Sequence, residues 1–508
     1  MNLFLLSHEL LVLALALGVL LADLWLPVEA KRKLGHAAAI GLGLILLYSI
    51  CFVNLAPGEI RYAFGPDSAN GPYALDALAL FFKRFFLVAA IIVLIMAVEF
   101  SDRIESGISE FYSLILFALA GMLFASSAND FSVLFVSLEL ITVTFYVLTS
   151  FQRGRLVSLE AGVKYLIIGA LSTSFTVFGI ALVYGVSGKL NFVELAAVAG
   201  QFGTNKLFLF GLLLVMVGLG FKIAAFPFQI WAPDVYQGAP SPTTAFLAVG
   251  SKAAGFVLLL RVLFTAVPTL TEHWANLLII ISAITILYGN LCALPQYNLK
   301  RMLGYSSIAH AGYLLLGIAA LSKAGQSAVL YYLSGYLFTV LGAFLVISLV
   351  MRHLDTEYIS SLAGLNQRSP LLAATLAFAM VSLAGIPPLA GFFGKFLLLK
   401  SVIEQGATHR GYYTLTFIAI AGVVISIYYY FGVVRAIYWS KEAPDVTELK
   451  TSCTVRVTLY ACMLGMLYLG IFPNAIVTSA DQAVAVLHKG PVVATQIPAV
   501  NAATENHQ

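Results

Sequence analysis

Long apolar runs dominate the chain and predict its secondary structure. A helix needs about 20 apolar residues to cross a hydrocarbon core of ~30 Å, and a window of that length finds fourteen segments in the 508 residues. Apolar and polar positions do not alternate along these runs, which excludes a β-barrel, and helices are the other way to satisfy backbone groups in lipid. The pattern predicts an all-α polytopic membrane protein with about fourteen spans, at 3–26, 35–55, 75–98, 111–128, 131–150, 157–186, 207–226, 242–265, 275–294, 302–321, 326–350, 371–400, 412–438 and 454–474.

The composition agrees with a membrane protein and excludes several other classes. The chain is 60% hydrophobic and 10% charged, whereas a soluble protein carries about 25% charged residues. The net charge of +4 is small and scattered, so it does not indicate nucleic-acid binding. The four cysteines form no CxxC pair and support neither a disulfide framework nor a metal site. There is no Walker motif, dinucleotide glycine fingerprint or HExxH, so we expect any redox chemistry to occur on another chain.

The two ends of the chain and its loops indicate an orientation. The apolar stretch 3–26 is too long for the core of a signal peptide and no basic region precedes it, so we interpret it as the first span. The tail 491–508 is polar and Ala-rich, and we expect it to be disordered. With the N-terminus outside, 14 of the 28 Lys and Arg residues fall in cytoplasmic loops and 7 on the opposite side. This bias predicts that both termini lie outside.

The remaining cations fall inside predicted spans. A charged side chain at mid-depth costs at least ~2.5–3.5 kcal/mol, so such groups face a polar interior or a partner. Three of them lie near a span end, where we expect the side chain to snorkel to the interface. Four lie deeper. The three cations near a span end are Lys83, Arg84 and Arg261, and the four deeper ones are Lys164, Lys222, Lys252 and Lys395.

Glu139 is the one carboxylate that the sequence places at comparable depth, within the span 131–150. A static salt bridge that pins two helices together is one interpretation. Such a bridge needs only two charges, however, and four deep lysines accompany this glutamate. Desolvation favours the neutral amine of a lysine, and a nearby carboxylate favours the ammonium. A lysine whose distance from Glu139 changes is therefore a group that can take up and release a proton.

Prolines interrupt two of the spans that carry deep lysines. Pro227 follows Lys222 in span seven, and Pro387 and Pro388 precede Lys395 in span twelve. A broken helix frees backbone groups that must be buried in protein or face water. Transporters use such broken helices in corresponding positions of two inverted repeats. Because spans seven and twelve are five helices apart, we predict two inverted five-helix repeats. Ordinary proline kinks are the alternative. The resulting domains are 1–98, 111–265, 275–438 and 454–474.

Two further segments carry polar groups between or within spans. His310 lies in span ten and can titrate near neutrality, so it is a candidate proton relay, with Ser306 and Ser307 nearby to bind water. A packed, hydrogen-bonded histidine is the alternative. We interpret WAPDVYQGAPSP as a short connecting loop, with Ser241 or Thr243 capping the next helix. Asp234 within it is a weaker candidate for proton uptake.

Five segments together resemble a known family. VSLELITVTFYVL, GVKYLIIGALSTSF, GLGFKIAAFPFQIWAPDVYQGAPSPTTAFLAVGSKAAGF, QYNLKRMLGYSSIAHAGYLLLG and SLAGIPPLAGFFGKF resemble the antiporter-like membrane subunits of proton-pumping NADH:quinone oxidoreductase, respiratory complex I. Lys395 in span twelve and the short tail favour the N type of this family over the M and L types. The resemblance implies fourteen helices, with broken helices seven and twelve in two inverted repeats.

The resemblance also implies a function and a set of working residues. Quinone reduction in partner subunits would drive proton translocation through this chain in a bacterial inner membrane. NADH, FMN, iron–sulfur clusters and quinone are expected on those membrane-arm and peripheral-arm partners, with no cofactor or metal on this chain. The implied proton-translocating residues are Glu139, Lys164, Lys222, Lys252, His310 and Lys395.

Two other functions remain open from the sequence. A subunit of a multisubunit cation/proton antiporter shares the fold and the lysines, although coordination of Na⁺ or K⁺ would favour more than one deep carboxylate. A purely structural spacer within a membrane arm is the third interpretation, and it predicts a dry interior between the lysines.

Overall fold

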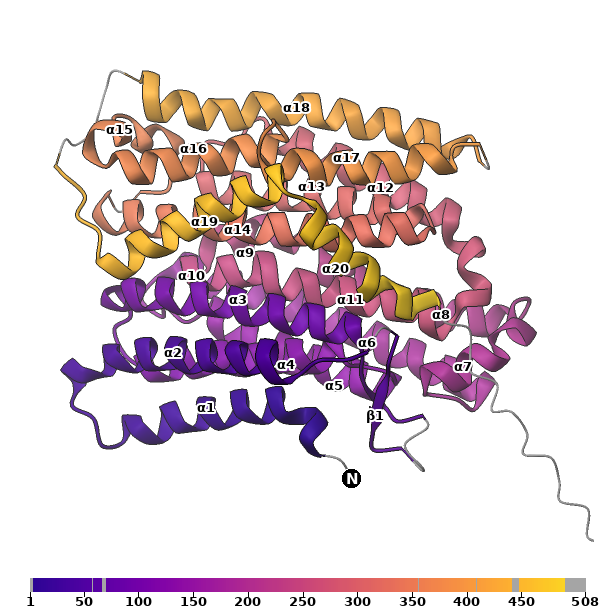
Figure 1. The fold of residues 1–508 in the computed structure, drawn as a ribbon. Coiled ribbons are helices and arrows are strands. Elements are labelled where there is room, and N and C mark those ends of the chain that lie inside the picture. Colours follow the sequence, from indigo (N-terminus) through magenta and orange to yellow (C-terminus); the bar gives the residue numbers. More distant parts are fainter. Residues whose placement is uncertain are drawn as a thin grey trace, which may run out of the picture.

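The computed structural model describes residues 3–56, 58–65, 70–354, 356–407, 409–440 and 447–488. They form a bundle of roughly parallel helices that lie side by side across the view in Figure 1. The helices are α1 (Ser7–Asp23), α2 (Val28–Phe52), α3 (Ala77–Phe100), α4 (Ile108–Ser126), α5 (Phe131–Thr149), α6 (Leu156–Ser187), α7 (Phe192–Ala199), α8 (Lys206–Ile223), α9 (Trp231–Gly238), α10 (Ser241–Phe246), α11 (Lys252–Arg261), α12 (Thr271–Ala293), α13 (Leu299–Ala319), α14 (Lys323–Leu354), α15 (Leu365–Arg368), α16 (Pro370–Ala384), α17 (Ala390–Gln405), α18 (Gly411–Trp439), α19 (Cys453–Ile471) and α20 (Asn474–Val484).

The described part of the chain contains little else. Short 3-10 turns lie at Leu3–Leu6, Ser101–Arg103, Gly200–Phe202, Pro268–Leu270, Ile359–Leu362 and Ala485–His488. A small antiparallel hairpin joins β1 (Arg61–Ala63) to β2 (Tyr73–Leu75), with Tyr62 opposite Ala74. The all-α prediction is thus confirmed, apart from this hairpin between α2 and α3. The predicted disordered tail, 491–508, lies outside the described residues.

The predicted spans correspond closely to the helices. Within the described residues, thirteen helical segments are long and apolar enough to cross a membrane. The remaining predicted span, span twelve at 371–400, is divided between α16 with 15 residues and α17 with 16 residues. Neither half is long enough to cross a ~30 Å core alone, because a helix rises ~1.5 Å per residue. The chain therefore has one clearly broken span at this position, as the paired prolines predict.

The broken span seven has a second half that the sequence prediction missed. α8 ends at Ile223, where Ala224 adopts a left-handed conformation with φ of 58°. The chain then turns through Pro227 and forms α9 at Trp231–Gly238. The prediction of a simple connecting loop for WAPDVYQGAPSP is wrong, because its Trp, Val and Tyr side chains are buried against the bundle and stabilise a helical turn.

Span eight also differs in detail from its prediction. It runs from Ser241 to Ala266, but π-helical turns interrupt it at Leu247–Ser251 and Val262–Ala266. The predicted capping by Ser241 or Thr243 is wrong, since the N-cap is Pro240 and no side chain caps this end. Pro240 fixes the backbone there without a side-chain acceptor. The first π-turn comes directly before Lys252, and such turns are frequent at functional sites.

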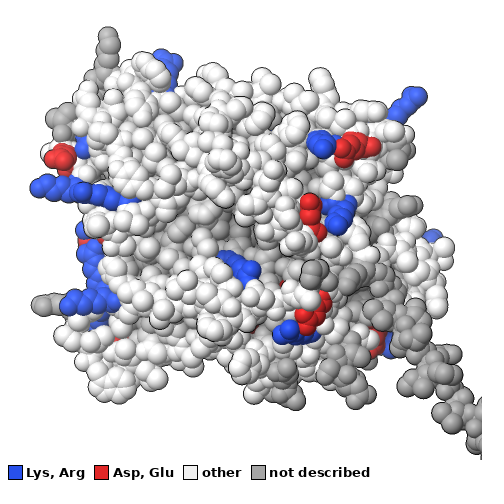
Figure 2. Space-filling view, in the orientation of Figure 1, with Lys and Arg blue, Asp and Glu red and all other residues white. Residues whose placement is uncertain are grey.

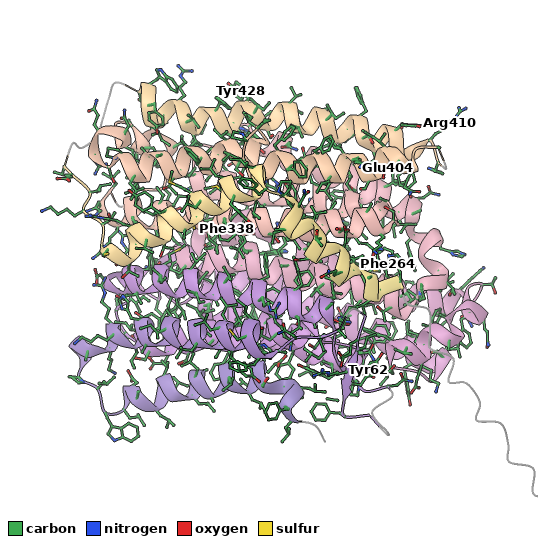
Figure 3. All side chains as sticks on the ribbon, viewed as in Figure 1. Tyr62, Phe264, Phe338, Glu404, Arg410 and Tyr428 are labelled. Carbon is green, nitrogen blue, oxygen red and sulfur yellow. The ribbon has the colours of Figure 1, made fainter. Side chains whose placement is uncertain are left out.

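The centre of the bundle lies around α10, α11, α13 and α14. The apolar windows of these helices are almost wholly buried, whereas most of α6, α2 and α19 faces outward. Exposed apolar side chains such as Ile167 on α6 and Tyr428 on α18 point away from the bundle, the latter at its edge in Figure 3. Charged side chains gather mainly toward the two ends of the bundle in Figure 2, and the middle of that face is uncharged except for one cationic patch in a hollow near its centre. This distribution fits a protein surrounded by hydrocarbon at mid-depth.

Candidate functional site

Lys222 lies in the last turn of α8, directly before the first helix break. Its side chain is 4% exposed, and its Nζ donates a hydrogen bond of 2.8 Å to Thr142 Oγ1 on α5. None of the ion pairs among the described residues, with a limit of 4.0 Å, includes Lys222. A buried amine is thus held by a neutral hydroxyl rather than by a carboxylate.

Glu139 lies one turn before Thr142 on α5, and the two side chains share a face of the helix. Its Oε1 accepts a hydrogen bond of 2.7 Å from Thr173 Oγ1 on α6. A cavity of about 20 Å³ lies between Glu139 and Lys222, with both threonines in its wall. One water needs ~10–15 Å³ and two to four polar partners. The structure therefore brings the predicted acid and amine together, with space for one water between them.

Lys164 has different partners from those that the sequence implied. Its Nζ lies 2.7 Å from Asp234 Oδ2 on α9 and 2.7 Å from Glu160 Oε1 on its own helix. Arg301 of α13 binds the other oxygen of Asp234 at 2.5 Å. Lys164 does not line the cavity beside Glu139, and its side chain is 41% exposed. Asp234, treated as a loop residue in the sequence, instead joins α6, α9 and α13.

Lys252 begins α11 and is 2% exposed. Its Nζ donates to the Ser307 carbonyl at 2.5 Å and to the Ser307 hydroxyl on α13. The hydroxyls of Tyr236 and Tyr336 lie 2.9 and 3.2 Å from that same Ser307 Oγ. Gly255, one turn along α11, packs so closely on α8 that an added Cβ would lie 3.3 Å from Lys222 Cγ. The stem of Lys222 therefore packs against α11, one turn from Lys252.

His310 continues this polar line on α13. Both ring nitrogens are occupied: Nδ1 shares a hydrogen bond with Tyr332 OH on α14, and Nε2 shares one of 2.9 Å with Tyr430 OH on α18. Tyr430 OH also lies 2.5 Å from Ser306 Oγ. The ring is 2% exposed. His310 is thus a hydrogen-bonded core histidine, and its two partners are hydroxyls that can both donate and accept.

Lys395 lies near the start of α17, beside the second helix break. Its Nζ donates to the carbonyls of Leu383 at 2.7 Å and Ala384 at 3.1 Å, at the end of α16. In a continuous helix these carbonyls would accept hydrogen bonds from backbone N–H groups of the next turn. The break depends on Gly385, whose φ is +86° and whose added Cβ would lie 2.9 Å from Lys395 Cδ. The helix break therefore supplies the ligands of the buried amine.

One face of α13 connects these groups. Ser307, His310 and Tyr313 are spaced by three residues and so share a face. Ser307 binds Lys252, and the Tyr313 ring centroid lies 5.1 Å from the Nζ of Lys395. His310 lies between them. The SSIAHAGY segment, in which the sequence singled out only the serines and the histidine, therefore leads from one buried lysine to the other.

Hydroxyl groups are the functional residues that the sequence prediction missed. They come from six helices, and they lie against Lys222, Glu139, His310 and Lys395 or against the serine that binds Lys252. A signal was present, since Tyr332 and Tyr336 are four residues apart on an otherwise apolar α14, but tyrosine is too common in this chain to single them out. The missed residues are Thr142, Thr173, Tyr236, Tyr313, Tyr332, Tyr336 and Tyr430.

Two of the three cations predicted to snorkel are buried instead. Lys83 is 0% exposed and pairs with Glu9 of α1, and Arg261 is 2% exposed and lies 2.9 Å from Asp76. The prediction that Glu139 is the only deep carboxylate is therefore wrong. Glu9 lies close to the N-terminus and Asp76 caps α3, so their depth was not visible in the hydropathy pattern. Only Arg84 reaches toward a helix end, at the C-terminus of α2.

Within the described residues, no group of three or more His, Cys, Asp and Glu side chains could hold a metal ion. The amines, imidazole and hydroxyls that the structure brings together are groups that can exchange protons.

Comparison with known proteins places this fold and site in a class. Residues 128–426, more than half of the chain, match the family described as NADH:quinone oxidoreductase/Mrp antiporter, transmembrane. An archaeal membrane-bound sulfane sulfur reductase has a similar chain, with a TM-score of 0.84 at 24% identity, covering 95% of this chain and 97% of that one. A chain of the Mrp complex from Dietzia sp. is also similar, with a TM-score of 0.78 at 20% identity, covering 96% of this chain and 98% of that one. These two likenesses establish the antiporter-like fold.

More similar relatives define the family. A curated NADH-quinone oxidoreductase subunit N from Moorella thermoacetica is 38% identical, over 94% of this chain and 98% of the relative. The subunit N from Rhodospirillum rubrum is 36% identical, over 94% of this chain and 95% of the relative. A chain of respiratory complex I from Thermus thermophilus, solved with bound aureothin, gives a TM-score of 0.76 at 32% identity, covering 93% of this chain and 98% of that one. The chain belongs to the family of NADH-quinone oxidoreductase subunit N.

Proposed function

We propose that this chain, as a membrane-arm subunit of NADH:quinone oxidoreductase, moves a proton along the line of buried groups from Lys222 to Lys395. Glu139 stabilises the protonated Lys222 through the intervening water site. Lys252 and His310 pass the proton along α13, and Lys395 controls its release toward the outside. The observation that carries the proposal is the shared face of α13, which joins two buried lysines through a serine and a histidine.

The lack of counter-charges supports a proton-exchanging role over a static one. Among the described residues, none of Lys222, Lys252 and Lys395 forms an ion pair within 4.0 Å. Uncompensated buried charges are strongly destabilising. Three permanent ammonium groups at these positions would be unfavourable, whereas amines that are charged only in turn are tolerated. By contrast, the static pairs of this chain, such as Lys83 with Glu9, are in direct contact.

Lys164 is proposed to tune the Glu139–Lys222 pair from α6. Its contacts with Asp234 and Glu160 make that influence depend on whether Asp234 holds the amine. Release from Asp234 would leave the ammonium with Glu160 as its one remaining carboxylate partner among the described residues, and its positive charge would then act more strongly on Glu139, two helical turns or more away along the bundle.

The free energy needed to move one proton across the membrane is close to the interaction energy of one ion pair. Moving a proton against ~180 mV requires about 4 kcal/mol, at ~2.3 kcal/mol per 100 mV. Two unit charges 4 Å apart interact with about 4 kcal/mol at an effective dielectric constant of 20. Opening or closing a Glu139–Lys222 pair across the single-water cavity therefore supplies a free-energy change of the right size.

The rest of the assignment concerns the setting of this chain. NADH, FMN, iron–sulfur clusters and quinone are held by partner subunits, and the chain lies in a bacterial inner membrane with both termini outside. Residues 111–265 and 275–438 are inverted repeats, whose equivalent breaks lie at α8–α9 and α16–α17. The similar position of a buried lysine beside each break supports this pairing.

The test is a Lys222→Ala variant of the assembled enzyme in proteoliposomes. Proton pumping per NADH oxidised is expected to fall while the subunits still co-purify. Normal pumping would refute the assignment, and a Glu139→Ala variant that fails only in assembly would favour a static pin. Co-purification with flavin and iron–sulfur subunits separates this function from a multisubunit cation/proton antiporter, which has none of them.

A further inference from the structure

A groove opens on the side of the bundle between α2, α3, α14, α19 and α20, away from the buried lysines. Its volume is about 500 Å³, within the ~300–1,000 Å³ typical of ligand sites. The oblique helix α20 crosses this face in Figure 1 and packs against α3 and α14. Phe338 of α14, labelled beside α19 in Figure 3, forms part of the wall.

The wall of the groove changes from polar to apolar along the helix axes. Asn54 lies just after the end of α2, Gln482 lies in the last turn of α20, and Arg84 lies two turns into α3 with its guanidinium reaching back to the end of α2. Leu46, about 9 Å before the end of α2 at ~1.5 Å per helical residue, and Phe338 line the deeper part. A ligand that matches this wall has a polar group beside the end of α2 and an apolar body that runs along the helices.

Arg84 supplies a charge at the polar end. Its Nη2 donates to the carbonyls of Ser49 at 2.8 Å and Val53 at 2.9 Å, in the last turn of α2. These bonds cap α2 and fix the orientation of the planar guanidinium. No acid among the described residues pairs with it, and Nη1 has no hydrogen-bond partner in that part of the chain. An arginine fork held in one orientation is well suited to a phosphate.

We propose that this groove binds a phospholipid, with its phosphate on Arg84 Nη1 and Asn54 and its acyl chains against α2, α3 and α14. Charge complementarity favours this occupant over an apolar helix of a neighbouring subunit, because such a helix would leave the guanidinium without a counter-charge next to hydrocarbon. The phospholipid would lie between the first three helices and the C-terminal helices, and so help to hold α20 against the bundle.

The experiment uses the intact complex in proteoliposomes that contain a phospholipid with a photoreactive diazirine in one acyl chain. After irradiation, labelled peptides of this subunit are identified by mass spectrometry. Label is expected on α2 near Leu46 and on α14 near Phe338. Arg84→Gln removes the charge. Ile50→Trp fills the groove from a side chain that is 50% exposed and leaves the charge in place. Arg61→Gln, on an exposed hairpin arginine paired with Glu59, is the matched control.

Both groove variants are expected to lower the labelling at least about tenfold, the factor that corresponds to ~1.4 kcal/mol, and Arg61→Gln to leave it unchanged. Equal labelling in all variants, no label in the wild-type groove, or labelling of a neighbouring subunit's helix at this position would each overturn the proposal. Because Ile50→Trp does not touch Arg84, a fall in that variant alone means that apolar contacts, not the phosphate contact, hold the lipid, which also refutes the assignment of Arg84. The readout is independent of proton pumping, so its failure is distinct from a failure of the proposed function.

Discussion

Replacing Thr142 by valine tests the proposed role of Lys222 with a minimal change in shape. Thr142 Oγ1 is the hydrogen-bond partner of the Lys222 amine, at 2.8 Å, and valine keeps the volume of the side chain while removing the hydroxyl. A hydrogen bond to a charged group contributes about 1.5–3 kcal/mol. A loss of ~2 kcal/mol lowers the equilibrium constant for protonating Lys222 about 30-fold, at ~1.36 kcal/mol per factor of ten. Proton pumping is therefore expected to fall strongly.

The assay is the ratio of protons pumped to NADH oxidised by the assembled complex in proteoliposomes. Thr144→Val is the matched control, because Thr144 is two residues away on the same helix and its hydroxyl binds only the Leu140 carbonyl of its own helix. We expect Thr144→Val to keep the wild-type ratio and Thr142→Val to lose most of it. An unchanged ratio in an assembled Thr142→Val enzyme would show that Lys222 does not carry the proton in the way proposed.

Three further outcomes follow from other contacts. Ser307→Ala removes the hydroxyl ligand of Lys252 and is expected to lower the pumping ratio while NADH oxidation by a soluble electron acceptor stays normal. Gly385→Ala places a side chain at a left-handed position that already contacts Lys395, which costs about 1–2 kcal/mol. The thermal unfolding temperature of this variant should therefore fall. The control is Gly185→Ala, where an added Cβ meets nothing within 4 Å, and its unfolding temperature should stay unchanged. Asp76→Asn leaves its buried arginine partner without a counter-charge, which typically costs ~3–5 kcal/mol, so less of this subunit should be recovered in the purified complex.

Much of the fold was predictable because the bilayer imposes simple rules. Span length and the absence of alternation predicted the helices, and each broken span was located from prolines next to a lysine. Glu139 and Lys222, which line one cavity, could be singled out because both are charged groups inside long apolar runs, where any charge is conspicuous. Lys252 and Lys395 stood out for the same reason. The inverted repeats and the roles of these residues stay predictions that the proposed experiments address.

The remainder of the site depends on information that hydropathy does not carry. Thr142 and Ser307 are polar enough to bind an amine but too common in membrane helices to be recognised by type. The depth of Glu9 was hidden by its position near the chain start, and its pairing with Lys83 requires the three-dimensional contact between α1 and α3. Asp234 was placed in a loop because the prolines around it resemble a turn, although tertiary packing stabilises α9.

The contacts also indicate which parts of the subunit must move during transport. Ser307 and His310 have a fixed spacing because α13 is a continuous helix. Their hydroxyl partners already contact them, so a proton can pass along this helix without a rearrangement of its backbone. The two ends of the line are different. At Glu139 the acid and the amine are separated by room for one water, and at Lys395 the amine is held by carbonyls that belong to an interrupted helix. Small displacements at these places change the electrostatic energy of a lysine by several kcal/mol, because the interaction energy of two nearby charges changes steeply with distance in a low-dielectric interior.

Conformational change coupled to pumping is therefore expected at the α8–α9 and α16–α17 breaks, with α13 remaining rigid. Hydrogen exchange measured during turnover should accelerate at the two breaks and stay slow along α13; faster exchange confined to α13 would contradict this mechanism.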